Sequence, residues 1–292
     1  MSQKKKLTKK SIKIVKPQIW NFKVIKGKSA WKEVVYSARV SGVPPSVKDR
    51  DVFMMIVEND YSSALEHVTI KFDIKITKGN APEFLEHRMV SHTGYSTRYI
   101  KASKGIEKKT QVYEIILPLH LMKGGALEKK ILLGRIEDSI MAYEELLSRK
   151  VPREIARYAL PFAQAVGIYH VTINLRSFLN LLSLRLCVRV APEFRSIAAQ
   201  LYFKLIKQLP IMRELMGCRG FMKGVCPEAG VTGVRVGKQH SFYPPCLFRN
   251  PNTSIHISTK DELQKGKKLP TFNLKKAIKA QEMVFKKWAE WK

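Results

Sequence analysis

The sequence predicts a basic α/β (α+β) domain with positively charged extensions at both ends, and three observations support this fold class. The 292 residues are 45% hydrophobic, which is the content of a globular protein with a buried core. Segments with a period of two occur together with segments of helical spacing. The formal net charge is +29, whereas a magnitude of about 2–8 is usual for a small soluble domain.

The first half of the chain mixes strands and helices. Val68, Ile70, Phe72, Ile74 and Ile76 alternate strictly with polar residues, which indicates a half-buried strand. Helices are expected to begin at N-caps Ser29 and Ser46, and a short helix leads into a loop at residues 91–99. The expected strands lie at residues 19–25, 68–76 and 112–117, and the expected helices at 29–39, 47–58 and 81–90.

The second half is rich in helical patterns. Helices are expected at residues 124–148, 152–166, 177–190 and 193–216. The helix at 177–190 is apolar nearly all round and should be central. Residues 217–260 are rich in Gly, Pro and Cys and are expected to be irregular or β. The last segment, 273–291, predicts a basic amphipathic helix that docks on its own body or on a partner.

These patterns divide the chain into a basic extension at 1–18, a domain at 19–216 and a C-terminal part at 217–292. Residues 1–16 carry seven Lys and no acid, and residues 260–292 carry ten Lys and four acids. The remaining charge of +16 therefore lies on the body. A basic tail on a basic body is typical of a protein that lies along a polyanion.

Several classes are disfavoured. The sequence contains no strongly apolar span of about 20 residues, and its first residues lack the apolar region of a signal peptide. We therefore expect a cytoplasmic protein without a membrane partner. Cys218, Cys226, His240 and Cys246 offer a possible zinc site, but the gap of seven between the first two differs from the preferred two to four. Free thiols, with no metal, are the favoured interpretation.

Two segments group cations with hydroxyls and amides. Residues 86–99 run from the end of the predicted helix at 81–90 through the loop after it and contain two Arg and two Ser, which are suitable donors to a phosphate. Residues 172–177 open the central helix with Asn174 and Arg176, and Asn180 and Arg185 follow on it. A helix N-terminus with such neighbours can bind an anion, although each residue alone is more often a cap or a surface ion pair.

These segments resemble the flavin-dependent thymidylate synthase family. Its signature reads Arg-His-Arg-x-x-Ser-x-Asn-Glu-x-Ser-x-Arg-Tyr, and this chain matches it with His87, Arg88, Ser91, Ser96, Arg98 and Tyr99. The segments Leu65–Val68 and Ala156–Pro161 and the Asn-x-Arg-Ser run also match, so the resemblance covers roughly residues 30–215. It implies a central, mostly antiparallel sheet flanked by helices, and a homotetramer whose sites lie between subunits.

The resemblance also implies ligands. The family uses FAD, dUMP, a methylene-folate and NADPH to methylate uracil. By position, the implied FAD contacts are His87, Arg88, Asn174, Arg176 and Asn180, and the implied dUMP contacts are Ser96, Arg98, Arg157 and Arg185. Four positions depart from the family: Glu86 replaces the first Arg, Thr93-Gly94 replaces Asn-Glu, and Arg189 replaces a His. A carboxylate in place of a phosphate-facing cation would repel the nucleotide.

We therefore consider three hypotheses. The first is an RNA-binding, ribosome-associated structural protein built on an eroded synthase fold, with rRNA and ribosomal proteins as partners, no confident catalytic residue and no required cofactor, although FAD binding stays possible. The second is an active thymidylate synthase or a related uracil methylase. The third is a thermophile enzyme with a Lys-rich surface. The predicted RNA contacts are Lys4, Lys5, Lys6, Lys9, Lys10, Lys13, Lys16, Lys265, Lys267, Lys268, Lys275 and Lys276.

Overall fold

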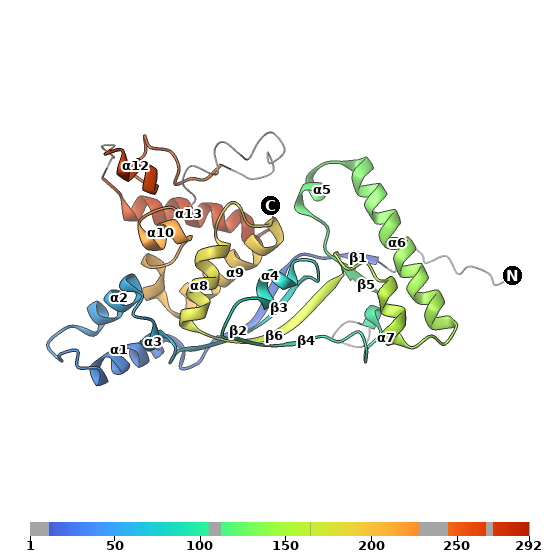
Figure 1. Ribbon diagram of the computed structural model, residues 1–292, viewed down its shortest axis with the longest axis horizontal. Helices are drawn as coiled ribbons and strands as arrows, with labels where there is room; N and C mark the ends of the chain where they lie inside the picture. The colour runs from blue at the N-terminus through green and yellow to red at the C-terminus, as the bar shows by residue number, and fades with distance from the viewer. Residues whose placement is uncertain (1–11, 105–111, 164, 228–244, 267–270, 292) are drawn as a thin grey trace. The chain divides into compact units, whose positions relative to one another are not determined.

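The computed structural model describes residues 12–104, 112–163, 165–227, 245–266 and 271–291 (Figure 1). The chain divides into two compact units that are interleaved along the sequence. Unit 1 comprises Met1–Gln18, Ile74–Glu86 and His92–His170, and unit 2 comprises Ile19–Asp73, His87–Ser91 and Val171–Lys292. The domain boundaries after residues 18 and 216 stay a prediction.

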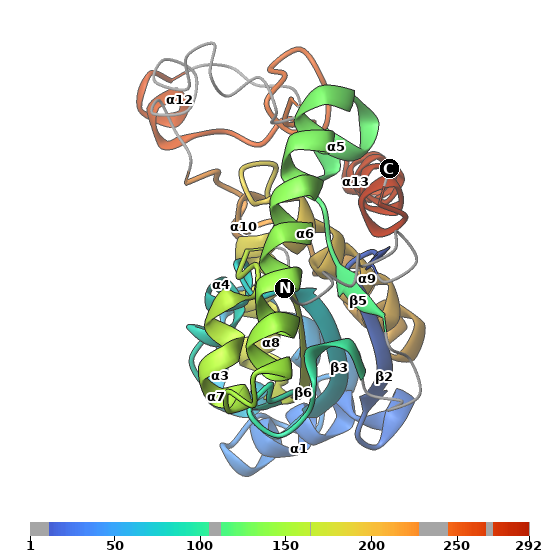
Figure 2. The ribbon, with the colours of Figure 1, turned by 90° about the vertical axis from the view of Figure 1, so that its right-hand side faces the viewer.

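Four strands form an antiparallel sheet flanked by helices, as the predicted fold class requires. Its order is β2-β3-β6-β4, with β2 at Gln18–Val24, β3 at Thr69–Thr77, β6 at Val166–Asn174 and β4 at Val90–Gly94. Figure 2 shows β2, β3 and β6 side by side. Along β3 the side chains of Ile70, Phe72, Ile74 and Ile76 are completely buried, as alternation between two faces predicts.

Two of these strands were not expected from the sequence. Residues 81–90 were predicted to be one helix followed by a loop, but α4 ends after Ala81–Leu85 and β4 follows. Met89 has a φ of 59°, which ends the helical path before the strand. Just beyond β4, the Tyr95 N–H donates to the carbonyl of Ile168 in β6 at 2.8 Å, so backbone pairing with β6 orders this segment.

Unit 2 contains most of the helices. They are α1 (Trp31–Val40), α2 (Asp49–Asn59), α3 (Ser62–Leu65), α8 (Leu175–Arg185), α9 (Pro192–Gln208), α10 (Arg219–Lys223), α12 (Lys260–Gln264) and α13 (Leu274–Ala289).

Both predicted N-caps are wrong. The Ser29 hydroxyl donates to the carbonyl of Lys26 at 2.8 Å, and Lys48, not Ser46, precedes α2. The helix expected at 193–216 breaks into α9 and a 3-10 turn, η5 (Pro210–Glu214), because Pro210 has no backbone N–H to donate.

The core of unit 2 is aromatic where β2, β3 and α8 meet. The rings of Phe22, Phe72 and Phe178 lie with centroids 6.1–6.3 Å apart. Most of α8 is buried, in agreement with its predicted central place. Helix α9 packs against both α8 and α13 (Figure 1), so the predicted C-terminal helix docks on its own body.

Unit 1 is built around α6 (Ala126–Ser148), which was predicted almost to the residue. Strands β1 (Ile12–Ile14) and β5 (Tyr113–Ile115) pair in parallel beside it, and α5 (Leu119–Lys123) and α7 (Arg153–Ala156) lie near its two ends (Figure 1). The buried side chains include Tyr113, Ile140 and Tyr143. The helix predicted at 152–166 is wrong, because α7 and the turn η4 (Arg157–Ala159) end before Pro161, which disfavours the helical conformation of the residue before it.

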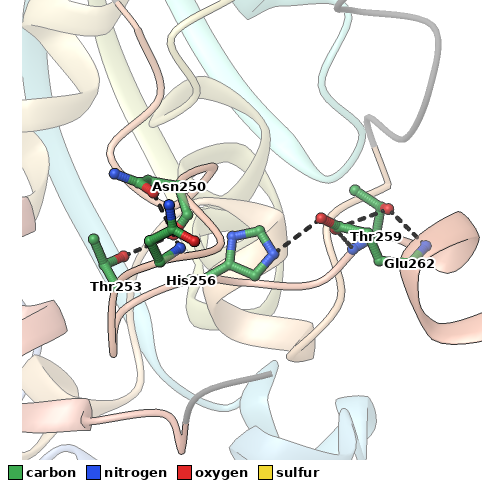
Figure 3. Close-up of polar contacts among 6 residues, drawn as sticks. Asn250, Thr253, His256, Thr259 and Glu262 are labelled. Atoms are coloured by element: carbon green, nitrogen blue, oxygen red, sulfur yellow. Dashed lines mark hydrogen bonds and ion pairs between the residues drawn. The ribbon is translucent and has the colours of Figure 1, made fainter. Parts of the chain in front are cut away.

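The segment before α13 is irregular in its described part, apart from short turns and α12. Thr259 caps α12: its hydroxyl accepts from the Glu262 N–H at 3.2 Å, and the Glu262 carboxylate accepts from the Thr259 N–H at 2.8 Å (Figure 3). The same carboxylate lies 3.2 Å from Nε2 of the buried His256. Burial raises the pKa of Glu262, but the hydrogen bonds from Thr259 and the charges of His256 and Arg249 outweigh it and leave the pKa lowered.

No helix in the described ranges has both the length and the apolar character needed to cross a bilayer.

Candidate functional site

The predicted ligand contacts form two groups, which lie in different units. The α8 group, in unit 2, consists of His87, Arg88, Asn174, Arg176, Asn180 and Arg185. The Arg98 group, in unit 1, consists of Ser96, Arg98 and Arg157. Arg185 was predicted with the nucleotide contacts, and the structure places it in the same unit as the predicted FAD contacts.

His87 and Arg185 are in direct contact within the α8 group. The Arg185 Nε–H donates to Nε2 of His87 at 3.3 Å, and the guanidinium lies 5.1 Å from the ring centroid of Phe194. Burial, and then the positive charge of Arg185, lower the pKa of His87 to about 4. At neutral pH His87 is therefore an uncharged imidazole with Nε2 as an acceptor, and Arg185 is the positive charge of the pair.

The remaining α8 group residues line the start of α8. Asn174 is its N-cap, and its Oδ1 accepts from the Ser177 N–H at 2.8 Å. Arg176 and Asn180 are exposed one helical turn apart. Arg176 pairs with Glu66 at 2.5 Å, and the side-chain Oδ1 of Asn180 accepts from Arg219 at 3.4 Å. Arg219 was not predicted as a site residue, because it lies 39 positions away in the sequence.

The α8 group suits an anionic ligand. Its cations are Arg88, Arg176 and Arg185, with Arg219 beside them, and Glu66 is the acid paired with the group. Arg88 is exposed at the start of the segment that leads into β4. Guanidinium forks and amides are the donors that bind phosphate oxygens well, so these residues fit the pyrophosphate of a dinucleotide such as FAD.

The Arg98 group is built on the turn after β4. Arg98 donates its backbone N–H to the hydroxyl of Ser96 at 3.3 Å and pairs with Glu154 at 3.1 Å. Its guanidinium lies 5.7 Å from the ring centroid of Tyr99. Arg153, at the start of α7, donates to the Tyr99 carbonyl at 2.8 Å. The turn and α7 are therefore joined by Arg98, which was predicted to face a nucleotide, and by Arg153, which was not.

Arg157 has a cationic neighbour that sequence reasoning missed. Burial, and then the charge of Arg157, lower the pKa of Lys78, which follows directly after β3. Like charges repel each other, and an anion between Lys78 and Arg157 would relieve this repulsion. Lys78 is therefore a candidate phosphate contact alongside Arg157. The signal in the sequence was its position at a strand end, directly before Gly79-Asn80.

The structure accounts for the departures from the family signature. Glu86 is exposed at the end of α4, so the repulsion expected of an inward carboxylate is not supported. A Cβ on Gly94 would lie 2.8 Å from the ring of Tyr169. The Tyr169 ring therefore occupies the space that a side chain at position 94 would need. Arg189 is exposed and lies beyond the end of α8 at Arg185, not on the helix as expected.

The thiols do not form a metal site in the described structure. Cys218, Cys226 and Cys246 pack against the core of Phe248, Ile257 and Ala277, and His240 lies outside the described residues. Burial, with weaker repulsion among the thiols, raises the pKa of Cys218 to about 12 and of Cys246 to about 11. Within the described ranges, no three His, Cys, Asp or Glu side chains are grouped to hold a metal ion.

The predicted RNA contacts are only partly described. Lys13, Lys16, Lys265, Lys275 and Lys276 are exposed. The others, Lys4, Lys5, Lys6, Lys9, Lys10, Lys267 and Lys268, lie outside the described residues.

Comparisons with known proteins agree with this fold. The solved structure of a UMP/dUMP methylase, PolB from Streptomyces cacaoi bound with 5-Br dUMP, matches with a TM-score of 0.54 at 20% identity, covering 68% of this chain and 94% of that one. Flavin-dependent thymidylate synthases are similar in sequence. One from Pyrococcus abyssi is 32% identical over 58% of this chain and 68% of its own length. One from Thermococcus onnurineus is 31% identical over 62% and 74%.

The fold is thus that of thymidylate synthase-like methylases. The model of the family described as thymidylate synthase complementing protein matches residues 23–211, more than half of the chain. The chain therefore belongs to this family, and the resemblance found in its signature is confirmed. These findings favour the enzyme hypothesis over a ribosome-associated protein on an eroded fold.

Proposed function

We propose that this protein is a flavin-dependent methylase that adds a one-carbon group to the uracil ring of a uridine nucleotide, UMP or dUMP. The observation that carries the proposal is the family match over residues 23–211, which contain the α8 group and the Arg98 group. The names of the similar proteins, flavin-dependent thymidylate synthases and a UMP/dUMP methylase, supply the reaction class.

The α8 group would hold FAD, which supplies the redox chemistry of the reaction. Arg88, Arg176 and Arg219 offer forked donors to its pyrophosphate, and Asn180 adds an amide. His87 stays uncharged because its pKa is about 4, and since its Nε2 accepts from Arg185, its Nδ1–H can donate a hydrogen bond without adding a further positive charge. In this proposal Asn174 acts mainly as the helix cap that orients this group.

The Arg98 group would hold the nucleotide. Arg157 and Lys78 supply two neighbouring cations for a phosphate, and Arg98 is fixed by Glu154. The partial neutralisation of Arg98 by Glu154 leaves Arg157 and Lys78 as the stronger anion site. This assignment adds Lys78 to the residues that the family resemblance implied.

A methylation assay tests the proposal. Purified protein is incubated with FAD, methylene-tetrahydrofolate and NADPH, with either UMP or dUMP, and the methylated nucleotide is measured by mass spectrometry. We expect product from at least one nucleotide and a flavin absorbance spectrum in the purified protein. Flavin-loaded protein that binds neither UMP nor dUMP and yields no product would contradict the proposal.

Lys78→Gln and Arg157→Gln test the nucleotide side. Each removes a charge that would bind phosphate, and we expect kcat/KM to fall by about tenfold or more, since a hydrogen bond to a charged group contributes about 1.5–3 kcal/mol. Arg135→Gln is the matched control, because Arg135 is a highly exposed cation on α6. Equal losses in all three variants would count against a specific role for Lys78 and Arg157.

A further inference from the structure

We propose that the surface of α13, together with the adjoining groove, binds single-stranded RNA. This inference is independent of the proposed methylase activity. The family match ends at residue 211, whereas α13 covers Leu274–Ala289, so the lysines of α13 lie outside the part that the family model describes.

Helix α13 presents a basic face, which consists of Lys275, Lys276, Lys279, Lys286 and Lys287. All five side chains are exposed. At 3.6 residues per turn they fall within a sector of about 120° around the helix axis. A row of lysines on one side of a rigid helix can contact successive phosphates of a nucleic-acid strand.

The opposite face of α13 is firmly attached to the body. Phe285 and Ile278 are buried, and the Phe285 ring lies 5.2 Å from that of Tyr202 in α9. The buried Gln281 donates to the Met216 carbonyl at 2.9 Å. This burial also disfavours a lipid bilayer as the partner, because an interfacial helix needs a free apolar face to enter the membrane.

Two acids lie beside the basic face, Glu282 and the C-cap residue Glu290, and the first of them is already neutralised. Glu282 lies three residues after Lys279 and four before Lys286, and therefore on the same side of the helix. Both of its carboxylate oxygens accept from Arg213 of η5, at 2.7 and 2.5 Å, and it also accepts from the Tyr202 hydroxyl. Arg213 thereby cancels the negative charge that would otherwise repel a phosphate.

An open groove adjoins this face and offers an aromatic surface. It has a volume of about 410 Å³ and is lined by Phe203, Ile206, Lys207, Pro210, Arg213 and Glu282. Phe203 is half-buried, and its ring packs edge-on against Tyr202 with centroids 5.2 Å apart. Because Glu282 belongs to both the groove wall and α13, the groove runs beside the lysines.

Cations beside an aromatic ring are the combination that binds single strands. The lysines contact phosphates, and an aromatic ring stacks on an unpaired base. A duplex keeps its bases stacked inside and could not use Phe203. We assign the strand to RNA because its loops and ends expose unpaired bases, and the net charge of +29 favours a polyanion over a neutral ligand.

The test measures binding of the full-length protein to a fluorescent oligouridine of about 12 nucleotides, a length within the site sizes of single-strand binders. Anisotropy is recorded over a range of salt concentrations. We expect the triple variant Lys275→Gln, Lys279→Gln, Lys286→Gln to lose affinity by about tenfold or more. Its log–log salt slope should fall by about 2, because each contact to a single strand contributes about 0.7.

The matched control replaces three exposed lysines elsewhere, Lys28→Gln, Lys123→Gln and Lys130→Gln, and changes the net charge by the same amount. An equal loss in the control would overturn the assignment to α13. Tighter binding to oligothymidine of the same length, or binding to anionic phospholipid vesicles without binding to RNA, would overturn the assignment to RNA.

Phe203→Leu tests the groove separately. It keeps an apolar side chain and removes the ring, so we expect affinity to fall about fivefold or more with an unchanged salt slope, since stacking does not release counterions. Unchanged affinity for this variant would remove the groove from the binding surface. None of these binding measurements uses flavin or a nucleotide substrate. Their outcome therefore does not depend on whether the methylation assay gives product.

Discussion

The ring of Tyr169 explains why a glycine stands at position 94 of the signature segment. Its ring lies between two glycines: a Cβ on Gly94 would lie 2.8 Å from the ring, and a Cβ on Gly167 would lie 2.9 Å from it. His92 adds an edge contact with centroids 6.3 Å apart. Packing against Tyr169 thus explains the glycine at position 94, which the sequence alone showed only as a departure from the family signature.

Gly94→Ala should therefore destabilise the protein. The ring of Tyr169 cannot retreat from the new methyl group without approaching Gly167, so we expect unfolding free energy to fall by about 1–3 kcal/mol, the usual cost of overpacking. Urea unfolding at neutral pH measures the change. Gly134→Ala is the control, because a Cβ there meets nothing within 4 Å inside α6, and alanine should raise stability by about 0.5–1 kcal/mol. An unchanged stability for Gly94→Ala would contradict the close packing.

His87 predicts a pH dependence with a definite sign. Its pKa is lowered from 6.5 to about 4 by burial and by Arg185, so between these values the unfolded chain binds a proton that the folded protein does not. Stability from this group is thus present above pH 6.5 and is lost as the pH falls toward 4. Because the side chain is only half-buried, we expect a loss of roughly 1–2 kcal/mol after solvent screening.

Unfolding of His87→Gln at pH 7 and at pH 4.5 isolates this effect. Glutamine cannot be protonated, so the variant should lose less stability than the wild type over the same interval. If both proteins lose the same amount, His87 does not keep its lowered pKa in the folded state.

At the scale of elements, α8 depends on its cap. Asn174→Ala removes the acceptor for the Ser177 N–H, and we expect unfolding free energy to fall by about 1 kcal/mol. Asn174→Ser keeps a capping oxygen and should keep most of the stability. FAD affinity in Asn174→Ser, measured by fluorescence titration, then separates the two roles: retained affinity indicates a cap, and a large loss indicates direct contact.

Local sequence patterns correctly predicted those helices and strands that have one buried face and one exposed face. Strand β3 and helices α6 and α13 follow from alternation or helical spacing, because each has one face against a core. Strands β4 and β6 were missed, since pairing between distant segments, and not a local pattern, orders them. For the same reason Lys78 and Arg219, which come from other segments, were not among the predicted contacts.

At the scale of the whole molecule, the positive charge extends over residues that the family match does not cover. The family match ends at residue 211, and residues 260–292 alone carry ten Lys against four acids. The methylase proposal concerns the first region, and the RNA-binding proposal concerns the lysines of the second together with the groove that α9 helps to line. The net charge of +29 first suggested an RNA-binding protein on an eroded synthase fold. It is equally compatible with an active enzyme that also binds a polyanion.

Flavin binding should stabilise the whole chain, and the form of flavin should matter. A ligand that binds only the folded state adds about 2.7 kcal/mol at a hundred times its Kd, which raises the melting temperature by several degrees. FAD carries the pyrophosphate that the α8 group suits, and riboflavin lacks it. Thermal unfolding should therefore shift with FAD much more than with riboflavin at equal concentration, and Arg176→Gln should reduce the difference. Equal shifts with both flavins would show that the arginines of the α8 group do not bind the phosphates.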